Sequence, residues 1–202
     1  MKNRGLKDIF TVKVIIEDAL FAALAIVLNM LKPNTPAGFF INVSLGFVPV
    51  AFLALKNGFL NGMLSGLIFG ILDLFLRGLG TSNVISVTQA FFEYIIAFTL
   101  IGLAGLAHGS LKLSINKNKH AFAVLSILVG IFLGCLGKFG CHTIASATFF
   151  AKYLKVPKHG NIWAAAIIYQ LPSFLSTFAL ATVCLVLIYA IRPSLYEDSF
   201  TD

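Results

Sequence analysis

The chain has 202 residues, of which 58% are hydrophobic and 11% charged; its mean hydropathy is +0.93 and its formal net charge +7. A soluble domain typically has roughly 45–50% apolar and 25% charged residues, so this composition predicts an integral membrane protein. The polar linkers are too short for a soluble domain, which excludes a nucleotide, haem or dinucleotide site of the usual folded kind. If ATP drives this protein, another subunit binds it.

The apolar runs predict an all-α fold of six transmembrane helices in a single domain, residues 1–202, at about 20 residues per crossing. The helices are expected at about 12–31, 39–55, 58–76, 84–107, 121–151 and 162–191. The first run follows basic residues, as a signal peptide would. Glu17 and Asp18 interrupt its start and no small-residue cleavage site follows, so we expect a mature helix.

The distribution of lysine and arginine favours an orientation with both termini inside. With the N-terminus in the cytoplasm, nine basic residues fall on that side, namely Lys2, Arg4, Lys7, Lys13, Lys56, Lys112, Lys117, Lys119 and Arg192. Five fall outside, namely Lys32, Arg77, Lys152, Lys155 and Lys158. The positive-inside rule therefore predicts a multi-pass protein of the cell membrane with an N-in/C-in topology. Nucleic acid is not an expected partner, because the basic residues are juxtamembrane and have no basic domain around them.

Small residues at helical spacing mark two faces for close helix contact. Ala19 and Ala23 lie four residues apart in the first predicted helix. From spacing alone, packing within the chain explains this face better than a partner does. In the third predicted helix glycine recurs at every fourth position, at Gly58, Gly62, Gly66 and Gly70. That face marks either the tightest helix contact in the bundle or a surface for another protein.

The fourth predicted helix carries an acidic residue, Glu93, inside an apolar run. An acidic side chain at the centre of a membrane helix costs about 2.5–3.5 kcal/mol, so it is expected to have a function and a partner. The simpler explanation is an ion pair with Lys138, a lone lysine in the apolar run of the fifth predicted helix. Such a pair can still line a cavity.

Polar residues from three predicted helices lie at a similar depth below the outer surface. Glu93 and His142 are each about 13 Å below the outer ends of their helices, at 1.5 Å per residue. Tyr169 and Gln170 lie seven and eight residues into the sixth helix. We therefore predict one outward-facing cavity. For each residue alone, a hydrogen bond to a neighbouring helix is the simpler explanation.

Lys138 and His142 are four residues apart and share one face of the fifth predicted helix. That face can present a cation towards Glu93, with Tyr94 supplying a hydroxyl and Phe150 an aromatic wall. This combination suits a small polar ligand with ring nitrogens. The four histidines are dispersed and no hydrolase or metalloenzyme motif is present, so we expect no catalytic residues, no metal and no cofactor.

These motifs resemble the substrate-binding S components of energy-coupling factor (ECF) vitamin transporters, and among them the thiamine-specific family. The resemblance covers most of the chain. Its most specific parts are Glu-Tyr-Ile-Ile-Ala-Phe at 93–98, Ile-Gly-Leu-Ala-Gly at 101–105 and Lys-Phe-Gly-Cys-His at 138–142. The face of Ala19 and Ala23 also resembles the motif with which S components dock onto the coupling subunit.

The resemblance implies a protein that captures a vitamin from outside with high affinity. It would release the vitamin within a complex of a transmembrane coupling subunit and two ATPase subunits. The ligand contacts of thiamine-binding members match Glu93, Tyr94 and His142 here, and Phe150 stands at an aromatic position that is often tryptophan.

The sixth predicted helix departs from the family's pattern. The family's Tyr-x4-Asn is replaced by Tyr169, Gln170 and Pro172, so we expect Gln170 to take the place of the asparagine. The first loop offers Phe39 or Phe40 in place of tryptophan. Because these changes fall on ligand contacts, a thiamine precursor such as a hydroxymethylpyrimidine, or another heterocyclic vitamin, is an alternative ligand.

Two alternatives belong to other functional classes. One is a small intramembrane enzyme that uses Glu93 and His142 as acid and base. The other is a structural subunit, for which the glycine face of the third helix is the main support.

Overall fold

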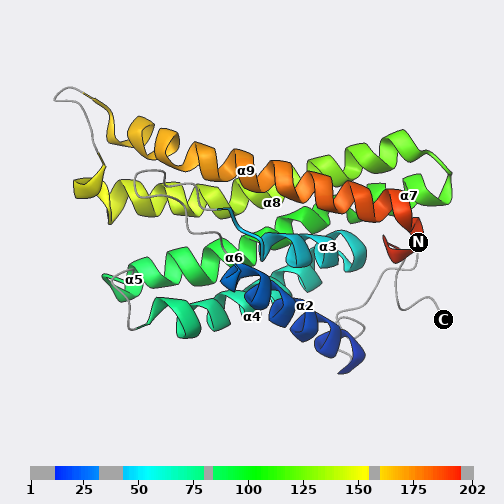
Figure 1. The fold of residues 1–202 in the computed structure, drawn as a ribbon, viewed down its shortest axis with the longest axis horizontal. Coiled ribbons are helices and arrows are strands. Elements are labelled where there is room, and N and C mark those ends of the chain that lie inside the picture. Colours follow the sequence, from blue (N-terminus) through cyan, green and yellow to red (C-terminus); the bar gives the residue numbers. More distant parts are fainter. Residues whose placement is uncertain (1–11, 32–42, 80–83, 155–159, 197–202) are drawn as a thin grey trace.

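The computed structural model describes residues 12–31, 43–79, 84–154 and 160–196 of the chain. Within these ranges every regular element is a helix and there is no β-strand. Long helices run side by side along the molecule (Figure 1). Phe39 and Phe40, predicted for the first loop, lie outside the described ranges.

Within the described ranges the chain forms six helical stretches, some of them composite. These are α2 (Val12–Met30), α3 (Phe47–Asn57), α4 (Phe59–Asp73) with its π-helical extension η1 (Leu74–Gly78), a composite stretch of α5 (Val87–Ala90), η2 (Phe91–Ile96), α6 (Ala97–Thr99), η3 (Leu100–Ala107) and α7 (His108–Asn116), then α8 (His120–Thr148) with the short η4 (Ala151–Tyr153), and α9 (Ile162–Ile191) with η5 (Pro193–Tyr196).

Four of these stretches are long and apolar enough to cross a membrane, namely 59–78, 87–116, 120–148 and 162–191. Helix α2 carries Lys13, Glu17 and Asp18 within its 19 residues. Helix α3 has 11 residues, or about 16 Å of helix, roughly half the thickness of a bilayer core. The architecture is therefore a helical membrane bundle, while a count of six crossings stays a prediction.

The second helix begins at Phe47 and not at residue 39, where the sequence analysis placed its start. Residues 43 to 46 are not helical, and the backbone N–H of Ser44 instead donates to the hydroxyl of Thr177 on α9 at 3.1 Å. Pro49 then falls in the first turn of α3, where a missing N–H costs nothing. A tertiary hydrogen bond of this kind cannot be inferred from hydropathy.

The sequence analysis left residues 108–120 between two predicted helices, and most of this segment is helix α7 instead. Leu111 and Ser114 are buried in α7, and His108 Nδ1 lies 2.9 Å from the carbonyl oxygen of Leu55. The turn comes later, at Asn118, whose φ of 53° is in the left-handed region. The apolar face of α7 is too short to predict a separate membrane span from the sequence, but it is long enough to pack against the bundle.

Helix α3 is the centre of the core. Nine of its residues are buried, namely Phe47, Pro49, Val50, Ala51, Phe52, Leu53, Ala54, Leu55 and Asn57. It lies in the middle of the bundle, with α2 and α4 on one side and α8 and α9 on the other (Figure 1). A short helix buried all round is consistent with an interior position.

The glycine face of α4 forms a backbone contact inside the bundle. A Cβ atom added to Gly66 would lie 2.3 Å from the carbonyl oxygen of Phe98, and one added to Gly70 would lie 2.2 Å from that of Tyr94. No side chain fits between these backbones. The structure therefore assigns this face to helix contact within the chain, and the contact fixes the position of the residue 91–107 segment.

Helix α2 exposes one pair of alanines and buries another. Ala22 and Ala25 are fully buried, whereas Ala19 and Ala23 lie on the exposed face. From spacing alone, Ala19 and Ala23 were expected to pack against another helix of the same chain. Their exposure does not support that expectation.

Candidate functional site

The segment that carries Glu93 starts with a capped helix end. Ser86 is extended, with φ −157° and ψ 156°, and its hydroxyl accepts a hydrogen bond from the backbone N–H of Gln89 at 3.1 Å. This satisfies one of the free donors at the helix N-terminus. After one turn the helix widens into the π-helical segment η2, which contains Glu93. π-Helical turns are rare and often occur at functional sites.

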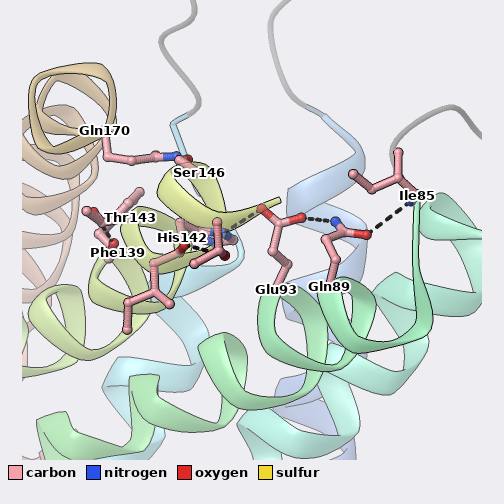
Figure 2. A network of polar contacts seen from close by, with 10 residues as sticks. Ile85, Gln89, Glu93, Phe139, His142, Thr143, Ser146 and Gln170 are labelled. Carbon is pink, nitrogen blue, oxygen red and sulfur yellow. Dashed lines mark hydrogen bonds and ion pairs between the residues drawn. The ribbon is translucent and has the colours of Figure 1, made fainter. Parts of the chain in front are cut away.

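The carboxylate of Glu93 lies between two side chains. Its Oε2 accepts a hydrogen bond from Nε2 of Gln89, one turn earlier. Its Oε1 lies 3.7 Å from Nδ1 of His142 on α8. Figure 2 shows Glu93 reaching across to His142 with Gln89 on its other side. An acid and an imidazole from two different helices therefore meet inside the bundle.

Aromatic rings surround the imidazole of His142. The ring of Phe98 is edge-on to it, with centroids 6.4 Å apart, and the ring of Phe139 lies at 5.9 Å. The His142 side chain keeps 20% of its surface exposed. One side of the imidazole is thus held by aromatic contacts and part of it remains accessible to a ligand.

Lys138 lies one turn below His142 and is buried. Its amino group donates to the hydroxyl of Ser44 and lies 4.8 Å from the ring centroid of Phe98 and 5.3 Å from that of Phe139. A desolvated cation over aromatic faces is a favourable arrangement. These contacts place the positive charge of Lys138 one helical turn from the imidazole of His142. The ion pair between Lys138 and Glu93 that the sequence analysis expected stays a prediction.

Helix α9 contributes one of its two expected residues to this region. Nε2 of Gln170 donates to the hydroxyl of Ser146 at 2.9 Å, and Ser146 follows His142 by one turn on α8 (Figure 2). Tyr169 is 40% exposed. Neighbouring residues on a helix point about 100° apart. Gln170 therefore faces α8, while the side chain of Tyr169 points towards the surface of the bundle.

Tyr94 and Phe150 follow Glu93 and the end of α8 along the chain. The ring of Tyr94 lies against η1, since a Cβ atom added to Gly78 would be 3.1 Å from its Cζ. Its ring centroid is 6.3 Å from that of Phe98. Phe150 follows the end of α8, half-buried, with its backbone N–H 3.3 Å from the carbonyl oxygen of Ala145. The structure therefore brings together Glu93 and His142, while Tyr94 packs against η1 and Phe150 lies just beyond the end of α8.

Asp73, an acid at the C-terminal end of α4, is part of a separate cluster. It is buried, accepts from Nδ2 of Asn29 at 2.9 Å and lies 3.2 Å from Arg77. The guanidinium of Arg77 also donates to the carbonyl oxygen of Asn29 at 3.0 Å. This cluster ties the end of α2 to η1 and leaves Glu93 as the acid that faces α8.

Sequence reasoning missed Gln89, Phe98 and Ser146. Gln89 precedes Glu93 by four residues and Ser146 follows His142 by four. Because residues four apart share a helix face, this spacing could have identified both.

The arrangement can bind a polar heterocycle. It offers a carboxylate oxygen, a partly exposed imidazole, the amide of Gln170 and several aromatic faces, which is the mixed lining of a small-molecule site. Among the residues that the structure describes, no group of three or more histidine, cysteine, aspartate or glutamate side chains is placed to hold a metal ion.

Comparisons with known proteins agree with these features. The family model described as "Thiamine transporter protein (Thia_YuaJ)" matches residues 15–197. The chain is 34% identical to thiamine transporter ThiT of Lacticaseibacillus paracasei, over 91% of this chain and 90% of that protein. It is 25% identical to thiamine transporter ThiT of Bacillus subtilis, over 91% and 94%. The solved structure of ThiT from Listeria monocytogenes has the same fold, with a TM-score of 0.80 at 24% identity, covering 92% of this chain and 97% of that one.

Proposed function

The chain belongs to the thiamine transporter protein family, and from that premise we propose that it is the substrate-binding subunit of an ECF transporter. In this role it captures thiamine, or a close relative, from outside the cell for ATP-driven uptake. It performs no chemistry on the vitamin and needs no cofactor of its own.

The observation that carries this proposal is the meeting of Glu93 and His142 from two helices, with a distance of 3.7 Å between Oε1 and Nδ1. A distance of 3.7 Å is longer than a hydrogen bond, so Oε1 can still accept a hydrogen bond from the ligand or interact with a positive charge on it. Thiamine has both an aminopyrimidine and a cationic thiazolium ring. A carboxylate beside an imidazole and aromatic faces suits such a molecule.

We assign the remaining contacts by position. Gln170, which bonds Ser146 one turn beyond His142, and Tyr94 provide polar groups, Phe150 provides an aromatic wall, and Lys138 supports the site from below. Tyr169, which is 40% exposed, reaches the ligand only if the outer part of the protein closes over it.

The transport cycle requires partner proteins in this proposal. A transmembrane coupling subunit and two ATPase subunits supply the energy. The exposure of Ala19 and Ala23 on α2 supports docking of the coupling subunit there, because small residues let a second helix approach closely. We place the chain in the bacterial cell membrane as a single multi-pass domain with six crossings and both termini inside.

The test is ligand binding by the purified full chain in detergent, without ATP. A ligand at a thousandfold excess over its Kd stabilises the folded protein by about 4 kcal/mol, so a thermal-shift screen of B vitamins and their precursors identifies it. We expect the largest shift with thiamine. A larger shift with hydroxymethylpyrimidine would change the ligand but keep the function, and no shift with any heterocyclic vitamin would contradict the proposal.

The variant Glu93→Gln then tests the site. Loss of a charge-assisted hydrogen bond removes roughly 1.5–3 kcal/mol, so we expect the thiamine Kd to rise about ten- to a hundredfold by isothermal titration calorimetry. An unchanged Kd would show that the ligand binds elsewhere.

A further inference from the structure

Gln89 is buried next to Glu93 and both ends of its amide are engaged. It has no exposed surface. Its Oε1 accepts a hydrogen bond from the backbone N–H of Ile85 at 3.2 Å, and its Nε2 donates to Oε2 of Glu93. A fully buried glutamine is uncommon, so this one requires an explanation.

The orientation of the Gln89 amide follows from hydrogen-bond chemistry. A backbone N–H can only donate, so the amide oxygen must face Ile85. The amide nitrogen must then face Glu93, where it can only donate. The assignment of oxygen and nitrogen is often ambiguous in a structure, but here the backbone partner decides it.

This fixed donor constrains the Glu93 carboxylate. With Oε2 held by Gln89, the other oxygen, Oε1, is directed at His142 (Figure 2). A hydrogen bond to an ionised carboxylate is charge-assisted and strongly directional. Each ligand contact to Glu93 therefore finds an oxygen that is already in place, which lowers the ordering cost of binding.

We propose that Gln89 is a positioning residue of the ligand site: anchored by the backbone of Ile85, it holds the Glu93 carboxylate in the orientation that meets the ligand. This inference rests on the proposed function, because it requires that Glu93 contacts the captured molecule. The alternative role for Gln89 is structural, as a side chain that satisfies the Ile85 N–H at the start of the helix.

The experiment is a double-mutant cycle on the full chain in detergent, with thiamine as the probe and calorimetric Kd as the readout. Gln89→Met keeps the volume of the side chain and removes its donor. Glu93→Ala removes the acceptor and puts no hydrogen-bonding group in its place. We expect Gln89→Met alone to raise the Kd about tenfold, as for loss of a hydrogen bond to a charged group. In the Glu93→Ala background we expect the same change to alter the Kd by less than about twofold.

A merely structural role predicts a different pattern. Gln89→Met would then weaken binding equally in both backgrounds, and that result would overturn the inference. A wild-type Kd in Gln89→Met would also overturn it. The matched control is Ser86→Ala, which removes the cap of the same turn without touching Glu93, and we expect its Kd to stay within about twofold of the wild type.

Two outcomes separate this inference from the proposed function. If the wild-type chain binds no thiamine and no related vitamin, the proposed function fails and the inference fails with it. If the wild type binds and Glu93→Ala weakens binding, but Gln89→Met gives either overturning result, only the inference fails. Should Gln89→Met not fold, Gln89→Asn replaces it: the shorter amide cannot reach both Ile85 and Glu93, so the same pattern is expected and the same results overturn it.

Discussion

Glu17 and Glu93 are equally exposed acids that are held in different ways. Each side chain keeps 17% of its surface exposed. Glu17 on α2 has both oxygens engaged at short distance, one by Lys56 at 2.7 Å and one by Asn57 at 2.8 Å. Glu93 has one oxygen held by an amide and the other 3.7 Å from an imidazole.

The difference shows that burial alone does not separate a structural acid from a binding one. A carboxylate that is saturated by a lysine and an amide has no strong site left for a ligand, and removing its cation leaves an uncompensated charge. A carboxylate with one oxygen oriented and the other loosely contacted is prepared to accept a new donor. We therefore expect variants near Glu17 to change stability and variants near Glu93 to change affinity.

The largest expected effect comes from a variant that changes stability and ligand affinity together. Gly70→Ala puts a Cβ atom 2.2 Å from the carbonyl oxygen of Tyr94, so α4 and the helix that carries Glu93 must move apart. Overpacking of this kind costs typically 1–3 kcal/mol, occasionally more, and here we expect about 3 kcal/mol. Thermal unfolding should occur at lower temperature, and the thiamine Kd should rise as well, because the backbone next to Glu93 shifts.

The control for Gly70→Ala is Gly140→Ala. Gly140 lies on α8 between Lys138 and His142, and nothing lies within 4 Å of a Cβ atom added there. Alanine favours helix over glycine by up to about 1 kcal/mol, so the melting temperature should hold or rise. If both variants were equally destabilised, close contact along the glycine face would not explain the loss.

A second variant acts on the structural acid alone. Lys56→Met removes the cation that lies 2.7 Å from Oε1 of Glu17. Removing one partner of a buried pair costs about 3–5 kcal/mol, and since both side chains are partly exposed, we expect about 2 kcal/mol. The free energy of unfolding should fall while the thiamine Kd stays unchanged. Recovery of much of this stability in the double variant Glu17→Met, Lys56→Met would confirm the cause, and a large rise in Kd would contradict the separation of the two regions.

Hydropathy predicted the long apolar helices well but not the path of the chain between them. The expected range of the last helix, 162–191, is the range of α9 in the structure. The start of α3 at Phe47 could not be predicted, because the non-helical segment before it is held by a hydrogen bond between Ser44 and Thr177, residues 133 positions apart. Sequence periodicity reports the face of a helix and carries no information on such distant partners.

For the site, counting depth along each helix placed Glu93 and His142 at one level, and the structure puts them side by side. That they bind a ligand stays a prediction. Depth does not give the rotation of a helix, so it could not separate Gln170, which faces α8, from the exposed Tyr169. It also could not show the π-helical turn at Phe91–Ile96, which changes the direction in which Glu93 points.

A third variant acts on the binding side of the comparison. His142→Ala removes the imidazole that faces Glu93 and lies among the rings of Phe98 and Phe139. The loss of one aromatic contact and one polar contact to the ligand should reduce the binding free energy by about 1–2 kcal/mol. The thiamine Kd should therefore rise about tenfold. The control is His120→Ala, which removes a histidine on the same helix that contacts the Tyr189 hydroxyl at 2.9 Å. Equal Kd values in the two variants would contradict a special role for His142.

The smallest expected effect concerns the link between α8 and α9. Ser146→Ala removes the acceptor of Gln170, so the amide of Gln170 is no longer held towards the His142 face. A neutral hydrogen bond contributes about 1 kcal/mol, which corresponds to a roughly fivefold rise in the thiamine Kd if Gln170 contacts the ligand. Ser126→Ala is the matched control, because Ser126 is also buried on α8 but its hydroxyl donates to the carbonyl oxygen of Phe122 on the same helix. Equal Kd values in the two serine variants would show that Gln170 does not contact the ligand. Glu93 and His142 would then be the polar centre of the site.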